Sequence, residues 1–241
     1  VLGQEVADGK AVPLGHQRRV DQLAAGEVHR TGQAHADAVL ALPILAALIA
    51  AHRRAAAMAG LGLGIAAGVK LWPILLAPLL ARALWPDRRA LAVFTLAFGA
   101  TTLALCAPLF WASLSAHAGL TAYAGGWSVN NAPYAWASYL FLQLVGPGTG
   151  EVLLRALVVL TAGAASLAVA APRSAGLEPL IARAAILAAA LFYLSPAQFP
   201  WYAAWFLPLA SASGAWPFVA ASIGLPVYYL FFPLAAAGLR D

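Results

Sequence analysis

The feature that most constrains this sequence is an apolar run from Ala55 to Trp85 that contains one lysine, Lys70, near its middle. Arginines lie on both sides of the run: Arg53 and Arg54 before it, and Arg82, Arg88 and Arg89 at or beyond its end. Because lysine and arginine are concentrated in the cytoplasmic loops of membrane proteins, both ends of the run are expected on the cytoplasmic side. The run must therefore cross the membrane an even number of times.

An even number of crossings predicts a hairpin of two helices, at 55–69 and 72–85. Each is shorter than the roughly 20 residues that a membrane span needs, so we expect short, tilted or partly re-entrant helices. Pro73 fits the reversal, because proline lacks an amide donor and disfavours helix at the preceding residue. Lys70 then lies at the outer turn, where its ammonium avoids the cost of at least ~2.5 kcal/mol at the bilayer centre.

The composition extends this interpretation to the rest of the chain. Of the 241 residues, 63% are hydrophobic and 10% are charged, and the mean hydropathy is +0.81. A water-soluble domain does not normally have this balance. We expect an all-α, polytopic integral membrane bundle with about 7 to 8 membrane helices, including short or re-entrant ones. Besides the run 55–85, the candidate spans are 36–51, 90–111, 152–171, 180–195, 200–213 and 216–234.

The first part of the chain differs from the rest. Residues 1–26 have neither an apolar signal core nor a sustained period, so we expect a poorly defined segment followed by a membrane-embedded domain at 27–241. The chain begins at Val1 without a methionine, which suggests that it is truncated at the N-terminus. The net charge of +5 does not indicate a nucleic-acid partner, because the arginines lie in short clusters between apolar segments.

The same count of crossings places the start of the span at 36 on the outer side with Lys70, together with two further features. One is the loop at about 112–135, where Trp127 and Asn130 belong to an aromatic and amide mixture that suits either a membrane interface or a sugar. The other is the segment "SPAQFPWY" at 195–202. The side chains of this segment that are candidates for substrate binding are Gln198, Trp201 and Tyr202. They can bind a sugar or a prenyl chain, or they can be ordinary aromatic-belt residues.

Two segments carry a resemblance to a known family. They are "HADAVLALPILAALIAAHRRAAAMAGLGLGIAAGVKLWPILLAPLL" at 35–80 and "LSPAQFPWYAAWFLPLA" at 194–210. Together they resemble the polyprenyl-phosphate-mannose-dependent mannosyltransferases of glycosyltransferase family 87, within the GT-C superfamily, over roughly 27–235. The resemblance implies a GT-C-like fold in a multi-pass protein of the plasma membrane, typically the bacterial inner membrane.

The resemblance also implies an activity and its partners. Such an enzyme is a hexosyltransferase, here expected to invert the anomeric centre, that takes a sugar from a polyprenyl-phosphate donor at the outer face without a cofactor. The acceptor is expected to be a lipid-linked or cell-envelope glycan. Family members open with a first span and an acidic loop that supplies the proposed catalytic base, and no such span precedes Glu27.

Residue roles follow from the chemistry of this transfer. Positive charge is needed near the leaving phosphate, and Lys70 is the candidate to bind it; the alternative is a lysine that reaches phospholipid head groups only. The catalytic candidates near the acceptor are Asp37, His35 and Glu27. Asp37 could instead be only a helix cap. His35 and Asp37 could also ligate a divalent ion, but two such residues form a weak pattern, so we expect no metal.

Two other classes of protein remain as alternatives. A polytopic transporter or flippase-like lipid carrier could use Lys70 as a binding or gating charge. A truncated chain could also be an inactive scaffold. No phosphate-binding loop, dinucleotide glycine pattern or nucleophile elbow is visible, so soluble nucleotide-sugar chemistry has no support.

Overall fold

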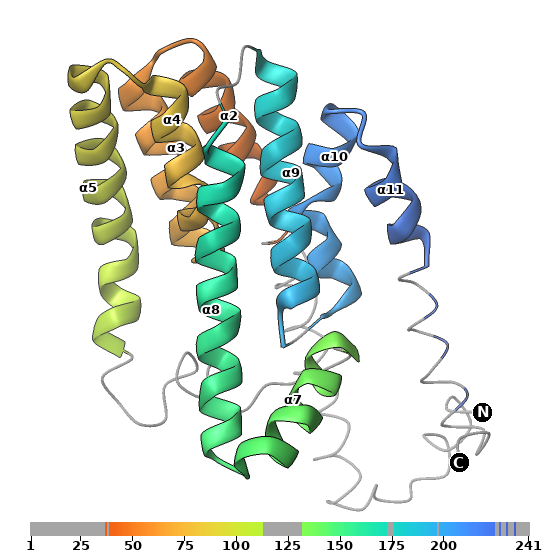
Figure 1. Cartoon of the computed structure of the whole chain (residues 1–241). Coiled ribbons are helices and arrows are strands. Elements are labelled where there is room, and N and C mark those ends of the chain that lie inside the picture. Colours follow the sequence, from red (N-terminus) through yellow and green to blue (C-terminus); the bar gives the residue numbers. More distant parts are fainter. Residues whose placement is uncertain are drawn as a thin grey trace, which may run out of the picture. The chain divides into compact units, whose positions relative to one another are not determined.

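The computed structural model describes residues 37, 39–112, 132–172, 176–196, 198–224, 227, 230 and 234. The chain divides into the units Val1–Ala36 and Asp37–Asp241, and all the described residues belong to the second unit. These residues form helices and no strand, which confirms the predicted all-α class (Figure 1). The predicted boundary between residues 26 and 27 lies outside the described residues.

The apolar run forms the predicted hairpin. It consists of α3 (Ala56–Val69), the short 3₁₀ helix η1 (Trp72–Leu76) and α4 (Ala77–Leu84). Arg54, which precedes the run, donates a hydrogen bond from Nη1 to the backbone oxygen of Trp85 at 3.5 Å. The two ends of the run therefore lie together, and the helix breaks between Val69 and Trp72 as predicted.

The hairpin packs between neighbours on both sides. The preceding helix, α2 (Ala41–His52), contacts α3 and α4, and the following helix, α5 (Arg88–Ala112), makes the most extensive contact with α3. Arg54 has φ of +61°, in the left-handed region, at the connection that turns the chain from α2 into α3. This backbone conformation lets a connection of three residues reverse the chain direction.

A ridge of glycines explains the close approach of α3 to α5. Gly60, Gly64 and Gly68 recur every four residues, so they lie on one face of α3. A Cβ atom built on Gly60 would lie 2.6 Å from the backbone oxygen of Phe94 in α5. Small residues at such positions let two helix backbones pack at short distance in a membrane, where apolar side chains gain little from leaving lipid.

In the part of the chain that the structure describes, three helices are long and apolar enough to cross a membrane. They are residues Arg88–Pro108 of α5, α8 (Thr149–Ala170) and α9 (Leu177–Leu194). The described residues also hold three shorter apolar stretches, at Ala41–His52, Ala56–Val69 and Trp72–Leu84. Many large apolar side chains on α5 and α8 are exposed, as expected for a surface that faces lipid: Leu96, Leu103, Leu105, Val152, Val159, Leu160 and Leu167.

Two predicted spans near the C-terminus differ from the structure. Residues 200–213 form the 3₁₀ helix η2 (Pro200–Trp205) and the short helix α10 (Leu207–Ala212), not one regular helix. Prolines at 200 and 208 explain the interruption, because a proline inside a helix removes a hydrogen bond and clashes with the preceding turn. The predicted span 216–234 is represented by α11 (Trp216–Ile223), and most residues after Gly224 are not described.

The sequence interpretation missed one helix, α7 (Ala132–Val145), whose first residues were assigned to the outer loop. It packs against α8, and the Tyr134 hydroxyl donates to Oε1 of Glu151 at 3.1 Å. Glu151 also pairs with Arg155 one turn further along α8. Burial raises the pKa of the Tyr134 phenol, so the phenol remains a proton donor to this carboxylate.

The glycine ridge makes a prediction about stability. Gly60→Ala should lower the free energy of unfolding by about 1–3 kcal/mol, because the new methyl group meets the backbone of α5. The matched control is Gly99→Ala on α5, where a Cβ atom meets nothing within 4 Å and helix propensity favours alanine. Thermal unfolding of the purified protein in detergent measures both. Equal effects of the two substitutions would contradict this packing.

Candidate active site

Lys70 lies where α3 ends. Its backbone is extended, with φ of −148° and ψ of 146°, and its amide still donates to the carbonyl of Ala66 at 3.0 Å. The neighbouring Gly68 packs against Leu105 of α5. At 1.5 Å per residue, Leu105 lies about 26 Å along α5 from Arg88, so Lys70 is close to the far end of the α5 span. The lysine therefore leaves the helix at the turn of the hairpin, as predicted from the flanking arginines.

An ion pair joins this lysine to the beginning of α2. Lys70 Nζ lies 2.6 Å from Oδ1 of Asp37, whose side chain is fully buried, whereas the side chain of Lys70 is 25% exposed. Burial lowers the pKa of the Lys70 ammonium, and the Asp37 carboxylate opposes this shift. The structure thus gives the Asp37 carboxylate an ammonium partner.

Two aromatic residues of η2 complete the surroundings of the pair. Trp205 donates its indole N–H to Oδ1 of Asp37 at 2.9 Å, so this oxygen accepts from both Trp205 and Lys70. Lys70 Nζ also lies 4.0 Å from the ring centroid of Tyr202 and 4.8 Å from that of Trp205. Such positions over aromatic rings stabilise a cation, most strongly where water is excluded.

The 3₁₀ geometry of η2 explains why these two rings meet. Side chains three residues apart are eclipsed in a 3₁₀ helix, which has three residues per turn. Tyr202 and Trp205 have this spacing, and their rings stack with centroids 4.5 Å apart. Trp72 of η1 stacks on Trp205 from another part of the chain, at 5.7 Å between centroids. Two short 3₁₀ helices therefore bring three aromatic rings to the ion pair.

Five buried side-chain polar atoms in the described residues have no hydrogen-bond partner. They are Oδ2 of Asp37, the indole nitrogens of Trp72 in η1 and Trp201 in η2, Nε of Arg82 in α4 and Oγ1 of Thr102 in α5. A buried polar group without a partner is unfavourable by about 1–3 kcal/mol, and in native proteins such groups concentrate where a ligand, a water molecule or catalysis requires them. Three of the five belong to Asp37, η1 and η2, and together with the ion pair they mark this region as the strongest candidate site among the described residues.

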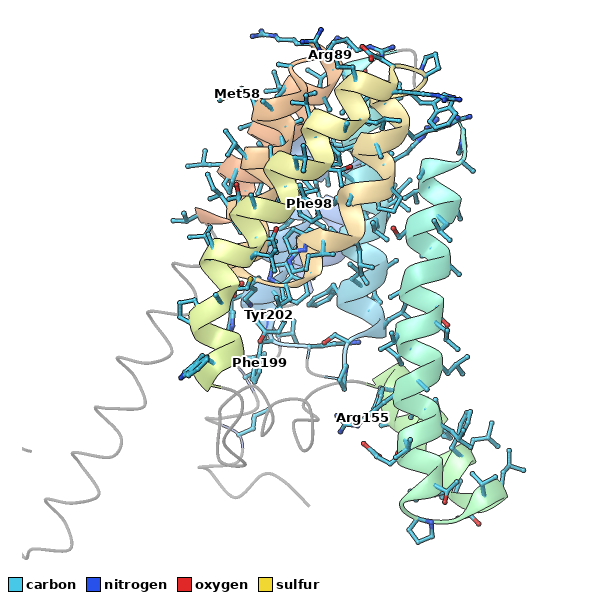
Figure 2. The ribbon with its side chains drawn as sticks, turned by 90° about the vertical axis from the view of Figure 1, so that its left-hand side faces the viewer. Met58, Arg89, Phe98, Arg155, Phe199 and Tyr202 are labelled. Carbon is cyan, nitrogen blue, oxygen red and sulfur yellow. The ribbon has the colours of Figure 1, made fainter. Side chains whose placement is uncertain are left out.

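The remaining residues of the segment "SPAQFPWY" mainly hold its shape. Gln198 is buried and donates from Nε2 to the backbone oxygen of Tyr193 at 2.8 Å, which ties the segment to the end of α9. Trp201 is partly buried and stacks on Phe199 with centroids 4.5 Å apart. Figure 2 shows Phe199 and Tyr202 toward one end of α5 and Arg89 at the opposite end. The arginine-rich end and the candidate site thus lie toward opposite ends of α5.

The structure brings together three of the predicted site residues, Asp37, Lys70 and Tyr202. The other predicted residues that the structure describes, Gln198 and Trp201, lie in the same segment as Tyr202. The predicted residues Glu27, His35, Trp127 and Asn130 lie outside the described residues.

Sequence reasoning missed Trp205 and Trp72. The spacing of Tyr202 and Trp205 in "PWYAAW" was a usable signal for Trp205, had a 3₁₀ helix been considered there. In the described ranges, no three His, Cys, Asp or Glu side chains lie close enough together to hold a metal ion.

Comparison with known proteins identifies the family. No curated protein and no solved structure matches the chain significantly. Residues 28–196 match the family described as Glycosyltransferase family 87. The matched region includes Asp37 and Lys70 and ends just before η2, so Tyr202 and Trp205 lie beyond it. Because the match covers well over half of the chain, the protein belongs to glycosyltransferase family 87 and is a membrane-embedded glycosyltransferase.

Proposed function

We propose that this protein transfers a hexose, with mannose the expected sugar, from a polyprenyl-phosphate donor to a lipid-linked or cell-envelope glycan acceptor. The transfer inverts the anomeric centre and takes place at the outer face of the plasma membrane. Membership of family 87 supports glycosyl transfer as the reaction class. It gives no support to the transporter or flippase-like alternative.

The observation that carries this proposal is the position of the Lys70 ammonium. It lies against the ring of Tyr202, which is toward the end of α5 opposite Arg89, and its side chain is partly exposed while its carboxylate partner is buried. An ammonium carries three N–H donors, and Lys70 directs one of them at Asp37. A lipid-linked phosphate at this end can therefore meet a preorganised positive charge.

Charge moves in a defined direction during the proposed reaction. The acceptor hydroxyl oxygen forms a bond to the anomeric carbon, and the bond from that carbon to the phosphate oxygen breaks with its electron pair going to the phosphate. The hydroxyl proton passes to a base. Lys70 stabilises the charge that develops on the leaving phosphate, an effect that is strong in a site from which water is excluded.

Asp37 can act in this scheme either as the partner of Lys70 or as the base, and the burial of its carboxylate distinguishes the two roles. As the partner of Lys70, it fixes the ammonium without needing contact with substrate. As the base, its unpartnered Oδ2 would accept the hydroxyl proton, which requires the site to open because this atom is fully buried. The geometry favours the first role. Glu27 and His35 remain proposed catalytic residues on the strength of the sequence alone.

Sugar and lipid contacts are proposed for the segment beside the ion pair. Tyr202 and Trp201 offer ring faces and edges, which suit a sugar or a prenyl chain, and Gln198 shapes the turn that presents them. Trp127 and Asn130 are proposed as further substrate contacts from the outer loop. Trp201 has the more accessible of the two rings. Tyr202 is buried and contacts Lys70, so it meets a substrate only when the site opens.

Transfer assays test the proposal. Lys70→Ala in the full-length protein should lower kcat for transfer of labelled mannose from polyprenyl-phosphate-mannose by about 100-fold or more, because a preorganised charge at the leaving group is lost. Asp37→Ala should also lower kcat strongly. The control, Arg89→Ala, removes a cation at the opposite end and should leave transfer unchanged. Full transfer by both site variants would refute the assignment.

Cysteine labelling tests which side of the membrane the site faces. In a Cys106→Ser background, which removes the buried native thiol, Trp111→Cys near the end of α5 should react with a membrane-impermeant maleimide added to intact cells. Arg88→Cys, at the beginning of the same helix, should react only after the membrane is permeabilised. The reverse pattern would place the ion pair on the cytoplasmic side and contradict the proposal.

A further inference from the structure

We propose that Trp205 is a positioning residue, which holds the Asp37 carboxylate through its indole N–H and thereby fixes Lys70 for the transfer reaction. This inference rests on the proposed function. It adds a residue that lies beyond the region matched to the family and outside the set expected from the sequence.

The first argument is the shared oxygen. Lys70 Nζ at 2.6 Å and Trp205 Nε1 at 2.9 Å both donate to Oδ1 of Asp37. A carboxylate held by one donor can rotate about its terminal torsion, which is broad. A second donor from a different element restricts this rotation. Trp205 therefore determines which carboxylate oxygen Lys70 meets and leaves Oδ2 as the oxygen without a partner.

The second argument is that Trp205 is not placed to bind a sugar itself. The residue is 8% exposed, and both Tyr202 and Trp72 stack on its indole ring. A sugar-binding tryptophan presents an open ring face, which these contacts do not leave. Any influence of Trp205 on transfer must therefore pass through the side chains that it touches, of which Asp37 is the hydrogen-bonded one.

The third argument is the distance along the chain that the contact spans. The indole of Trp205 comes from η2, while Asp37 precedes α2 and Lys70 follows α3. The stack with Trp72 adds η1 to the same cluster. Trp205 thus hydrogen-bonds η2 to the ion pair, and its ring stacks on both Tyr202 and Trp72. A donor held in this way has little freedom to follow a displaced carboxylate.

The variant that isolates the hydrogen bond is Trp205→Phe, which keeps an aromatic ring and removes the N–H. We expect kcat for transfer to fall by about 10- to 100-fold, because small misplacements of a catalytic group have effects of this size. The acceptor KM should change little. Trp216→Phe is the matched control, since Trp216 is 70% exposed on α11, and it should leave both constants unchanged.

A double-mutant cycle separates positioning from a purely structural role. In an Asp37→Asn background, Trp205→Phe should change kcat and the donor dissociation constant by less than about twofold, because its target has been altered already. If Trp205→Phe has the same effect in both backgrounds, Trp205 acts independently of Asp37 and the inference is wrong. If Asp37→Asn transfers too slowly for kcat to be measured, the donor dissociation constants of the four proteins still give the coupling between the two residues.

An NMR measurement keeps this inference distinct from the proposed function. In full-length protein labelled with 15N-tryptophan, the indole signal lost in Trp205→Phe should shift in Asp37→Asn and stay in place in Arg89→Ala. An unmoved signal overturns the hydrogen bond and the inference with it. If the wild-type protein transfers sugar from no polyprenyl-phosphate donor, the proposed function is wrong. The catalytic part of this inference is then wrong too, even if the indole signal shifts as expected.

Discussion

The ion pair between the buried Asp37 and the partly exposed Lys70 is the interaction on which the arrangement of the site depends. Taking two charges out of water is unfavourable by several kcal/mol per ion, so such a pair persists only where geometry and additional hydrogen bonds compensate. Here the compensation comes from the 2.6 Å contact, the indole N–H of Trp205 and the rings of Tyr202 and Trp205. The beginning of α2, the end of α3 and η2 are therefore held at one point.

Interruptions of regular helix allow these segments to meet. If α3 continued through Lys70, the lysine would point from a helix surface, whereas its extended backbone turns the chain into η1. Prolines at the beginning of η1 and η2 favour these breaks, and the 3₁₀ geometry stacks Tyr202 on Trp205. The glycine ridge of α3 supports the same arrangement by fixing α3 against the long helix α5.

The sequence predicted the features that depend on local chemistry and on the membrane. Arginines at both ends of the run 55–85 predicted the hairpin, and the hydrogen bond from Arg54 to Trp85 confirms it. The part played by Trp205 could not be predicted in the same way, because its contact with Asp37 joins residues 168 positions apart and depends on a 3₁₀ helix where a regular span was expected. Helix α7 was missed because its first residues were assigned to the outer loop and residues 136–145 were included in no candidate span.

A thermodynamic cycle on the ion pair tests the central claim most directly. The free energy of unfolding would be measured for Asp37→Asn, Lys70→Met and the double variant. Each single change should be destabilising, most strongly Lys70→Met, which leaves a buried carboxylate without its cation, by about 3–5 kcal/mol. The double variant should lose less unfolding free energy than the two single variants lose together. The difference, which is the coupling free energy, should be about 0.5–3 kcal/mol. Additive effects would mean that the two residues do not act as a pair, and would contradict this account of the site.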